Sequence, residues 1–323
     1  MKFKMKTISI LFAALSVGFF TSCTKDDGIG SSGNIDSTNN LKTGNVNFVL
    51  TDAPFPSDMV AEANVTIDKI EIRKVIEAST DSTSTDSTNM DSSGFITIST
   101  ETQTFNLLDL RNGITADLAA AELDTGKYDQ IRLHVVTANI VLNDADSTTY
   151  DLKIPSGQQS GLKIKIQGGM TVTGGSMTTV LMDFDVSKSF IVQGNPKSHA
   201  GIKGFIFKPV IRAVVSETSD GGTVAAGNIS GHVTVGDSIN IGNAIIEIYQ
   251  MDTVVTSALT DSTGYYAILG IPAGDYDLKC TADGYEAYDN NNVSVSANDT
   301  TMVDIMLQPS VTDTTSVAIA VGL

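Results

Sequence analysis

Apolar and polar residues alternate with a period of two through most of this chain. Val46, Phe48 and Leu50 alternate with polar neighbours near residue 50, and Ile131, Leu133 and Val135 do so in a longer run. Successive side chains of a β-strand point to opposite faces of the sheet, so this period indicates half-buried strands. Counting such runs predicts at least nine strands joined by short turns between residues 44 and 217.

The run VTIDKIEIR, residues 65–73, departs from a clean alternation. Val65 and Ile67 share a phase with Lys69 and Glu71, while Ile70 and Ile72 take the other phase. A change of phase within one strand indicates a β-bulge, or a strand that is covered on both faces. Both alternatives fit the sequence.

One stretch of the first unit has a helical composition. Ile114 to Leu123 includes four alanines and Leu118, and these residue types favour a helix. We therefore expect a larger first domain, residues 44–217, made of strands and one short helix. Its many strands predict a sandwich or a partly closed barrel.

A second unit follows a Gly-rich and polar hinge at residues 218–226. Residues 227–308 contain seven short strand-like runs separated by tight turns, which predicts a small seven-stranded sandwich. The fold class is thus all-β, with two β-sandwich domains. The tail, residues 309–323, contains one apolar run, VAIAV, and its structure stays open.

Two segments are too polar to fold by themselves. Residues 23–43 and residues 78–94 consist mainly of Ser, Thr, Asn, Asp and Gly. Such segments bury too little apolar surface to offset the entropy lost on ordering. We expect the first to be a flexible tether and the second to be a disordered loop.

The start of the chain has the pattern of a secretory signal peptide. Three lysines precede an apolar run from Ile8 to Phe20, which is too short to span a bilayer. FFTSC, ending at Cys23, resembles the lipobox of bacterial lipoproteins. That resemblance implies removal of residues 1–22, acylation of Cys23, and attachment to a membrane through the lipid.

The residues after Cys23 bear on its location. Lys25-Asp26-Asp27 resembles a short signal of surface-exposed lipoproteins, so we expect an outer-membrane protein displayed at the cell surface. A periplasm-facing protein is the alternative.

The charge of the chain limits its partners. There are 20 basic and 37 acidic residues, and residues 1–22 contain three lysines and no acid. The remainder is strongly negative, so it repels nucleic acid and anionic lipid. After Cys23 only Cys280 remains, and we expect it to be an inert core residue.

The second unit resembles the carboxypeptidase regulatory-like domain, a transthyretin-like sandwich. The resemblance rests on the following stretches: SGHV (230–233), GNAIIEIY (242–249), TDSTGYYAILGIPAGDYDL (260–278) and ADGYEAY (282–288). It implies a non-catalytic accessory domain. Its similarity to certain starch-binding modules supports glycan binding by analogy.

The first unit resembles an uncharacterised bacterial lipoprotein family, a domain of unknown function. The stretches that resemble it are LTDAP (50–54), NLLDLRNG (106–113), GKYDQIRLHV (126–135), PSGQQSGLKI (155–164), MDFDVSKS (182–189) and FKPVIR (207–212). This family has no assigned activity, so the resemblance implies no mechanism.

The sequence shows no catalytic motif. His134, His199 and His232 lie far apart, and none has a neighbour at metal-ligand spacing. Ser160 lacks the sequence context of a known nucleophile. We predict no enzyme activity, no bound metal and no cofactor.

One constellation suggests a binding site. Asp183 and Asp185 would face one side of a strand about 7 Å apart. With Ser187 and Ser189 they would form a row suited to Ca²⁺ or to sugar hydroxyls, or else a solvated acidic edge.

Three functions follow from these features. The first is a non-enzymatic outer-membrane lipoprotein that displays two β-sandwich modules and binds an extracellular carbohydrate or protein. The second is an extracellular glycan hydrolase that uses acidic residues such as Asp183 or Asp185. The third is a structural subunit of a fimbria-like assembly, joined through an edge strand.

Overall fold

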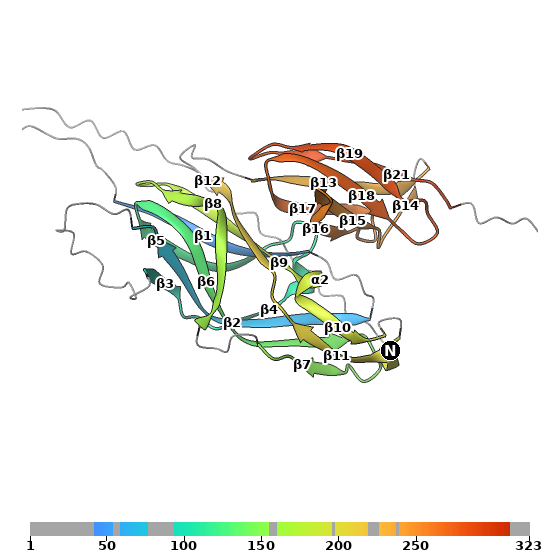
Figure 1. Cartoon of the computed structure of the whole chain (residues 1–323), viewed down its shortest axis with the longest axis horizontal. Helices are drawn as coiled ribbons and strands as arrows, with labels where there is room; N and C mark the ends of the chain where they lie inside the picture. Colours follow the sequence, from blue (N-terminus) through green and yellow to red (C-terminus); the bar gives the residue numbers. More distant parts are fainter. Residues whose placement is uncertain are drawn as a thin grey trace, which may run out of the picture. The chain divides into compact units, whose positions relative to one another are not determined.

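The computed structural model describes residues 42–53, 59–76, 94–154, 160–195, 198–218, 226–236 and 239–310 (Figure 1). The predicted signal peptide, Cys23, and almost all of the tether, the acidic loop, the hinge and the tail lie outside these residues. Within the described part of the chain, no helix has the length and apolar character needed to cross a membrane. The prediction of an all-β protein is confirmed.

The first domain contains the strands β1 to β12. Their bounds are β1 Thr43–Ala53, β2 Val60–Lys74, β3 Phe95–Ser99, β4 Gln103–Asn106, β5 Ala116–Asp124, β6 Gly126–Leu142, β7 Thr149–Asp151, β8 Leu162–Val172, β9 Met177–Asp185, β10 Phe190–Gly194, β11 Ile202–Phe207 and β12 Ile211–Thr218. Three short helical turns interrupt them: η1 Leu107–Leu110, α2 Val186–Ser189 and η2 His199–Gly201.

Ten of these strands form one sheet. Its order is β3-β2-β6-β8-β12-β9-β1-β5, with β4 also paired to β2 and β7 to β6. Strands β10 and β11 form a separate two-stranded sheet. The long sheet folds over on itself around one core (Figure 1), and the side chain of Gln103 on β4 donates to the carbonyl of Leu118 on β5. The two ends of the sheet therefore approach each other without a continuous ladder.

The core follows from the alternation seen in the sequence. Ile131, Leu133 and Val135 of β6 are buried in it, whereas Arg132 and His134 between them are not part of it. Burial of such side chains stabilises the fold by roughly 1.5–3 kcal/mol each. β6 is the longest strand of this sheet and pairs with β2, β7 and β8, so its inward face organises the core.

The mixed phase of residues 65–73 arises from bulges. The pairing of β2 with β6 shifts between Thr66 and Ile67 and again between Ile67 and Lys69. The extra residue returns Ile70 and Ile72 to the core beside Ile67, and places Lys69 and Glu71 on the outer face. The first of the two sequence interpretations, a bulge, is confirmed.

The predicted helix at residues 114–123 is wrong. These residues lie largely in strand β5, which pairs antiparallel with β1. Only Leu118 and Leu123 of β5 are buried, and the edge of the sheet offers β1 as a partner. The helix propensity of alanine exceeds that of most other residues by only about 0.7 kcal/mol or less per residue. Pairing with β1 therefore outweighs it.

The second domain contains β13 to β21. Their bounds are β13 Ala226–Val235, β14 Ile239–Asn240, β15 Ile245–Gln250, β16 Thr253–Leu259, β17 Tyr265–Pro272, β18 Gly274–Thr281, β19 Tyr288–Val295, β20 Thr300–Met302 and β21 Ile305–Leu307. β14 is a two-residue pair, and β20 and β21 both lie beside β13 as one interrupted strand. When β14 is left out and β20 and β21 are counted as one strand, the domain has the seven strands that the sequence predicts.

These strands form the two layers of a small sandwich. β14, β13, β17, β20 and β21 make one sheet, and β16, β15, β18 and β19 make the other. Their inward side chains form a second hydrophobic core, in which Cys280 is fully buried. Burial raises the pKa of the Cys280 thiol to about 12, so this thiol is a packed and unreactive group.

Gly231 allows a close approach of two strands in this sandwich. A Cβ atom at this position would lie 2.0 Å from the carbonyl oxygen of Val303, and the Tyr266 hydroxyl donates to that same oxygen at 2.6 Å. Val303 N also donates to the carbonyl of Ser230 at 2.8 Å. The backbone has no room for a side chain here.

The variant Gly231→Ala is therefore expected to destabilise the second domain. Overpacking of this kind costs about 1–3 kcal/mol or more, and calorimetric unfolding of the variant should show a lower melting temperature for one transition. Ser230→Ala on the same strand is the control and should change the free energy of unfolding by about 0.5 kcal/mol or less. Equal melting temperatures for the two variants would contradict this account of the packing.

Candidate functional site

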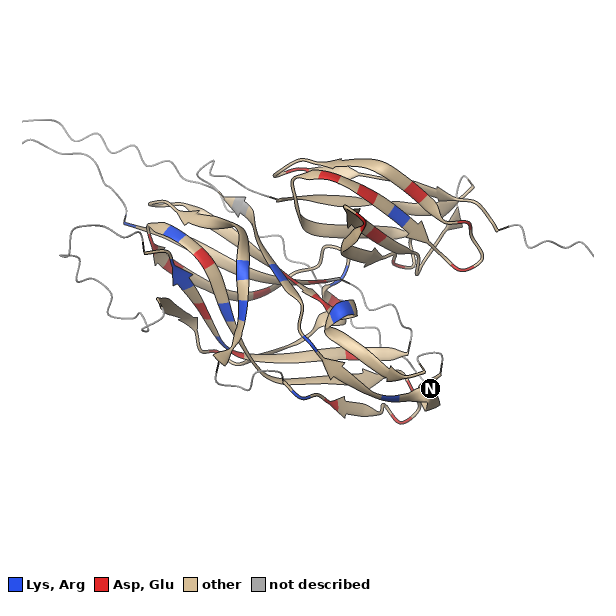
Figure 2. Cartoon of the chain, in the orientation of Figure 1, with Lys and Arg blue, Asp and Glu red and all other residues tan. Residues whose placement is uncertain are grey.

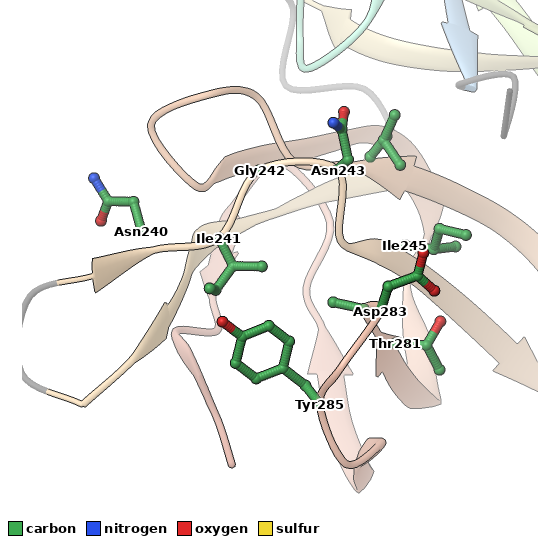
Figure 3. A pocket seen from close by; sticks show the side chains of 10 residues that line it. Asn240, Ile241, Gly242, Asn243, Ile245, Thr281, Asp283 and Tyr285 are labelled. Atoms are coloured by element: carbon green, nitrogen blue, oxygen red, sulfur yellow. The ribbon is translucent and has the colours of Figure 1, made fainter. Parts of the chain in front are cut away.

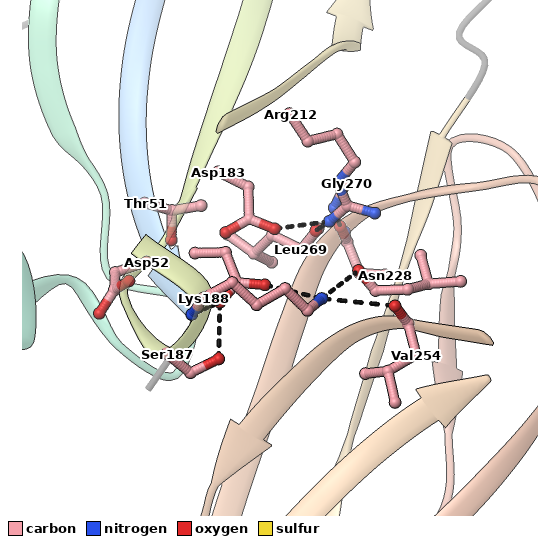
Figure 4. Close-up of polar contacts among 12 residues, drawn as sticks. Thr51, Asp52, Asp183, Ser187, Lys188, Arg212, Asn228, Val254, Leu269 and Gly270 are labelled. Atoms are coloured by element: carbon pink, nitrogen blue, oxygen red, sulfur yellow. Dashed lines mark hydrogen bonds and ion pairs between the residues drawn. The ribbon is translucent and has the colours of Figure 1, made fainter. Parts of the chain in front are cut away.

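The predicted acid–hydroxyl row lies at the end of β9. Asp183 is the partner of Thr51 on β1 and of Arg212 on β12, and it is 7% exposed. Arg212 Nη2 lies 2.8 Å from Asp183 Oδ2, in an ion pair that is largely removed from water (Figure 4). Asp183 is thus a buried carboxylate with a cationic partner inside the chain.

Asp185 begins the short helix α2. Its Oδ1 accepts from the backbone N–H of Lys188 at 3.0 Å and from the Ser187 hydroxyl at 2.7 Å, and its Oδ2 lies 2.9 Å from Lys188 Nζ. This is the geometry of a helix N-cap, which satisfies N–H groups that have no partner within the helix. Asp185 therefore holds α2 in place.

The two serines belong to α2 rather than to a continuing strand. Ser189 is fully buried, and its hydroxyl oxygen accepts from Val210 N at 2.8 Å. Ser187 donates to Asp185 (Figure 4). The four predicted residues are neighbours, but the helical turn removes them from the single strand face that the sequence suggested.

Asp52 joins this group from β1. It is 7% exposed, its Oδ1 accepts from Val186 N at 3.1 Å, and its Oδ2 has no hydrogen-bond partner among the described residues. Burial and the nearby Asp183 raise the pKa of Asp52 well above its usual value. Burial also raises the pKa of Asp183, while Arg212 opposes that rise. These surroundings therefore favour the protonated form of Asp52 more than water does.

The three histidines have separate surroundings. His134 Nε2 lies 3.1 Å from Glu71 on the outer face of the first domain. His199 begins η2, and His232 Nδ1 lies 3.9 Å from Asp304 in the second domain. The described residues contain no group of three or more His, Cys, Asp or Glu that could hold a metal ion.

A surface groove lies at one end of the second domain. It is formed by the turn between β14 and β15 and by the loop between β18 and β19, and its volume is about 570 Å³. Asn240, Asn243, Thr281, Asp283 and Tyr285 are among its lining residues (Figure 3). Figure 3 shows the Tyr285 ring directed toward Ile241, with the side chains of Asp283 and Thr281 near each other.

Local backbone geometry shapes this groove. Asn243 has φ of 61° and Gly284 has φ of 84°, both in the left-handed region that Gly and Asn adopt most readily. The tight turn at Gly284 places Asp283 and Tyr285 on the same rim, and Tyr285 forms an isolated bridge with Pro309. The groove therefore combines an anchored aromatic ring with exposed amide and carboxylate groups.

Comparison with known protein families decides the identity of the first domain. The family model described as "Domain of unknown function (DUF4382)" matches residues 43–209, just over half of the chain. The chain belongs to this family. The model described as "Carboxypeptidase regulatory-like domain" matches residues 228–308, so the DUF4382 domain is followed by a regulatory-like domain. The resemblances of the two units to these domains are confirmed, whereas the lipoprotein nature of the chain stays a prediction.

Similarities to solved structures are weak. A cohesin–X-dockerin complex from Acetivibrio cellulolyticus has 26% identity and a TM-score of 0.22, over 26% of this chain and 58% of that chain. The minor pilin GBS52 of Streptococcus agalactiae has 12% identity and a TM-score of 0.22, over 81% and 95% of the two chains. The major pilin BcpA of Bacillus cereus has 10% identity and a TM-score of 0.23, over 83% and 71%. At these scores no function is transferred.

A search of curated proteins found no match.

The groove of the regulatory-like domain is not among the sites predicted from the sequence, although six of its ten lining residues lie in two of the stretches that identify the domain. The Asn-Ile-Gly-Asn run at 240–243 and the Asp-Gly-Tyr run at 283–285 are signals of turns. The sequence does not show that the two turns lie side by side.

The variant Asp52→Asn tests the raised pKa of the buried carboxyl. Because the folded pKa of Asp52 is raised, the native state holds a proton that the unfolded state releases, and stability falls as pH rises from the unfolded pKa toward the folded one. Asn does not titrate, so the melting temperature of the variant relative to wild type should rise as the pH increases from about 4, the ordinary pKa of Asp. Asp146→Asn, at an exposed position, should show no such trend. A difference that is independent of pH for Asp52→Asn would rule out this assignment.

Proposed function

We propose that this protein is a non-catalytic, lipid-anchored surface protein that binds a glycan in the groove of its regulatory-like domain. The observation that supports this most directly is the composition of the groove rim. Tyr285 supplies an aromatic face, and Asn240, Asn243 and Asp283 supply amide and carboxylate groups. Sugar rings have one apolar face and a periphery of hydroxyls, which these two kinds of group complement.

The size and construction of the groove favour binding. Its volume of about 570 Å³ lies within the range of roughly 300–1,000 Å³ typical of small-molecule sites. The residues lie at the ends of strands of a closed sandwich, so the rim is largely preformed. A preformed rim reduces the ordering cost of binding.

The same lining argues for binding rather than hydrolysis. Glycoside hydrolases use two carboxyl groups on either side of the scissile bond. Asp283 is the one carboxylate among the described residues that line the groove. Asp183 and Asp185, the acids of the hydrolase alternative, are buried and bonded to Arg212 and Lys188. The hydrolase alternative has no comparable support in the described residues.

An assembly subunit is the second candidate function. β20 and β21 pair with β13, and they expose Met302 and Met306, which are 71% and 51% accessible. An exposed sheet margin with apolar side chains can accept a strand from a partner. Concentration-dependent polymerisation of the purified protein would favour this function over glycan binding.

Location forms part of the proposal. The sequence that ends at Cys23 resembles a lipobox, and a polar tether follows it. Together with the strongly acidic composition of the remainder, this supports a pair of domains held away from a membrane by the tether. Two or three acyl chains would attach it stably, because each buried CH₂ contributes about 0.8 kcal/mol. We place it on the outer membrane facing the exterior.

The groove is tested by a glycan array with the purified protein. Tyr285→Ala and Asp283→Ala should each lower the affinity for the bound glycan about tenfold or more, equivalent to about 1.4 kcal/mol. Asp275→Ala is the matched control, because Asp275 is also exposed but lies outside the groove lining. Unchanged binding by both groove variants would exclude this site, and shortening of the glycan during incubation would favour a hydrolase.

The anchor is tested by Cys23→Ser. Wild-type protein should incorporate labelled palmitate and partition with membranes, and the variant should lose both properties because it lacks the acylated thiol. Protease treatment of intact cells should remove the wild-type protein if it faces the exterior. An unacylated wild-type protein in the culture fluid would refute the anchor, and protection of the protein until the outer membrane is opened would favour a periplasmic orientation.

A further inference from the structure

The outer face of the DUF4382 domain gathers basic residues on three adjacent strands. Lys69 and Arg73 lie on β2, Arg132 on β6, and Lys163 and Lys165 on β8 (Figure 2). The register aligns Glu71, Arg132 and Lys163 across the three strands, and aligns Gln130 with Lys165. The five cations therefore occupy one continuous area, called here the basic face.

Alternation explains why these side chains share one side of the sheet. Ile70 and Ile72 on β2, Ile131 and Leu133 on β6, and Ile164 on β8 point into the core. The residues between them must point outward. The positions of the cations are thus fixed by the same pairing that builds the core.

Two carboxylates lie among these cations. Glu71 is 4% exposed and lies 2.5 Å from Lys69 Nζ and 3.1 Å from both Arg132 Nη1 and His134 Nε2. Asp129 accepts two hydrogen bonds from Arg73, at 2.8 and 2.7 Å. These acids orient Lys69, Arg132 and Arg73.

Arg132 is further held by an aromatic ring. Its guanidinium carbon lies 3.7 Å from the centroid of Phe95, a residue that is 2% exposed and that belongs to none of the hydrophobic cores of the described chain. A cation at this distance interacts favourably with the ring face. Gly161 also packs here, since a Cβ atom on it would lie 2.7 Å from Arg132 Cγ. The guanidinium is therefore fixed in position.

Lys163 and Lys165 differ from the other cations. Both are exposed, and neither forms an ion pair with any residue that the structure describes. Two residues apart on one strand, their Cα atoms are about 7 Å apart. Like charges so close together, beside Arg132, repel each other. In a chain with a net charge of −17, this positive area is a local exception.

We propose that the basic face binds an acidic polysaccharide through its carboxylate or sulfate groups. The proposal rests on the proposed glycan-binding function and adds a second site with a different ligand chemistry. Lys163 and Lys165 contact the anionic groups, and the fixed Arg132 supplies a positive field beneath them. Lys163 and Lys165 are both exposed along β8, which suits contact with successive anionic groups of an extended polymer. The net negative charge of the chain disfavours densely charged polyanions such as nucleic acid.

The test measures binding of the full-length purified protein to polygalacturonate, chondroitin sulfate, neutral dextran and double-stranded DNA. Wild type should bind one or both acidic polysaccharides, bind them more weakly as NaCl rises, and bind neither dextran nor DNA. The double variant Lys163→Gln, Lys165→Gln should lose about tenfold or more in affinity. The double variant Lys163→Arg, Lys165→Arg should retain binding, because charge and not lysine itself is required.

Two controls separate the basic face from other surfaces of the chain. Lys203→Gln with Lys208→Gln makes the same charge change at exposed lysines elsewhere in the domain and should have little effect. Tyr285→Ala should leave binding to the acidic polysaccharide intact, so failure of the groove and failure of the basic face are distinguishable. Equal losses in the two Gln variants, binding to DNA as strong as to the polysaccharide, or no binding to either acidic polymer would overturn the proposal.

Discussion

The DUF4382 domain depends on the pairing of one long strand with its neighbours. β6 contributes Ile131, Leu133 and Val135 to the core on one face, and Arg132 and His134 to the charged layer on the other. A slip of one residue would exchange the two sets, burying charges without partners. The bulges in β2 preserve this arrangement by restoring Ile70 and Ile72 to the core after Ile67. The register of β6 with its neighbouring strands therefore determines both which side chains form the core and which charged side chains lie on the outer face.

The buried carboxyl groups of Glu71, Asp185 and Asp52 have three different kinds of surroundings. Glu71 keeps its charge: burial raises its pKa, but hydrogen bonds from Lys69, His134 and Arg132 outweigh this and hold the pKa below its usual value. Asp185 keeps its place as the N-cap of α2. Asp52 lacks a cationic partner within ion-pair distance among the described residues, and its pKa is raised well above normal. The neighbouring groups of each carboxyl, and not its residue type, therefore determine how its burial is compensated.

The sequence predicts the strands better than it predicts the sites. Period-two alternation in residues such as Val46, Phe48 and Leu50 identifies strands because burial of one face imposes it. The error at β5 arose because alanine favours a helix locally, while its pairing with β1 is decided by residues about 70 positions away. The same limit applies to function: Glu71 and Arg132 are separated in sequence by 61 residues, and only the register joins them.

The geometry expected for the acid–hydroxyl row is wrong for a related reason, and its ligand binding stays a prediction. Asp183, Asp185, Ser187 and Ser189 were expected on one strand face, but Asp185 caps a helical turn that ends the strand. The groove rim combines two turns whose residues are typical of turns anywhere. These residues form a candidate site only because the fold of the sandwich places the turn between β14 and β15 next to the loop between β18 and β19.

The central claim is that the groove of the regulatory-like domain is the glycan-binding site. Hydrogen–deuterium exchange of the full-length protein, with and without a glycan bound on the array, tests it most directly. The account predicts slower exchange confined mainly to residues 240–245 and 281–286, because a ligand in the groove covers those backbone amides. Protection confined to other segments, with unchanged exchange at the groove, would contradict it.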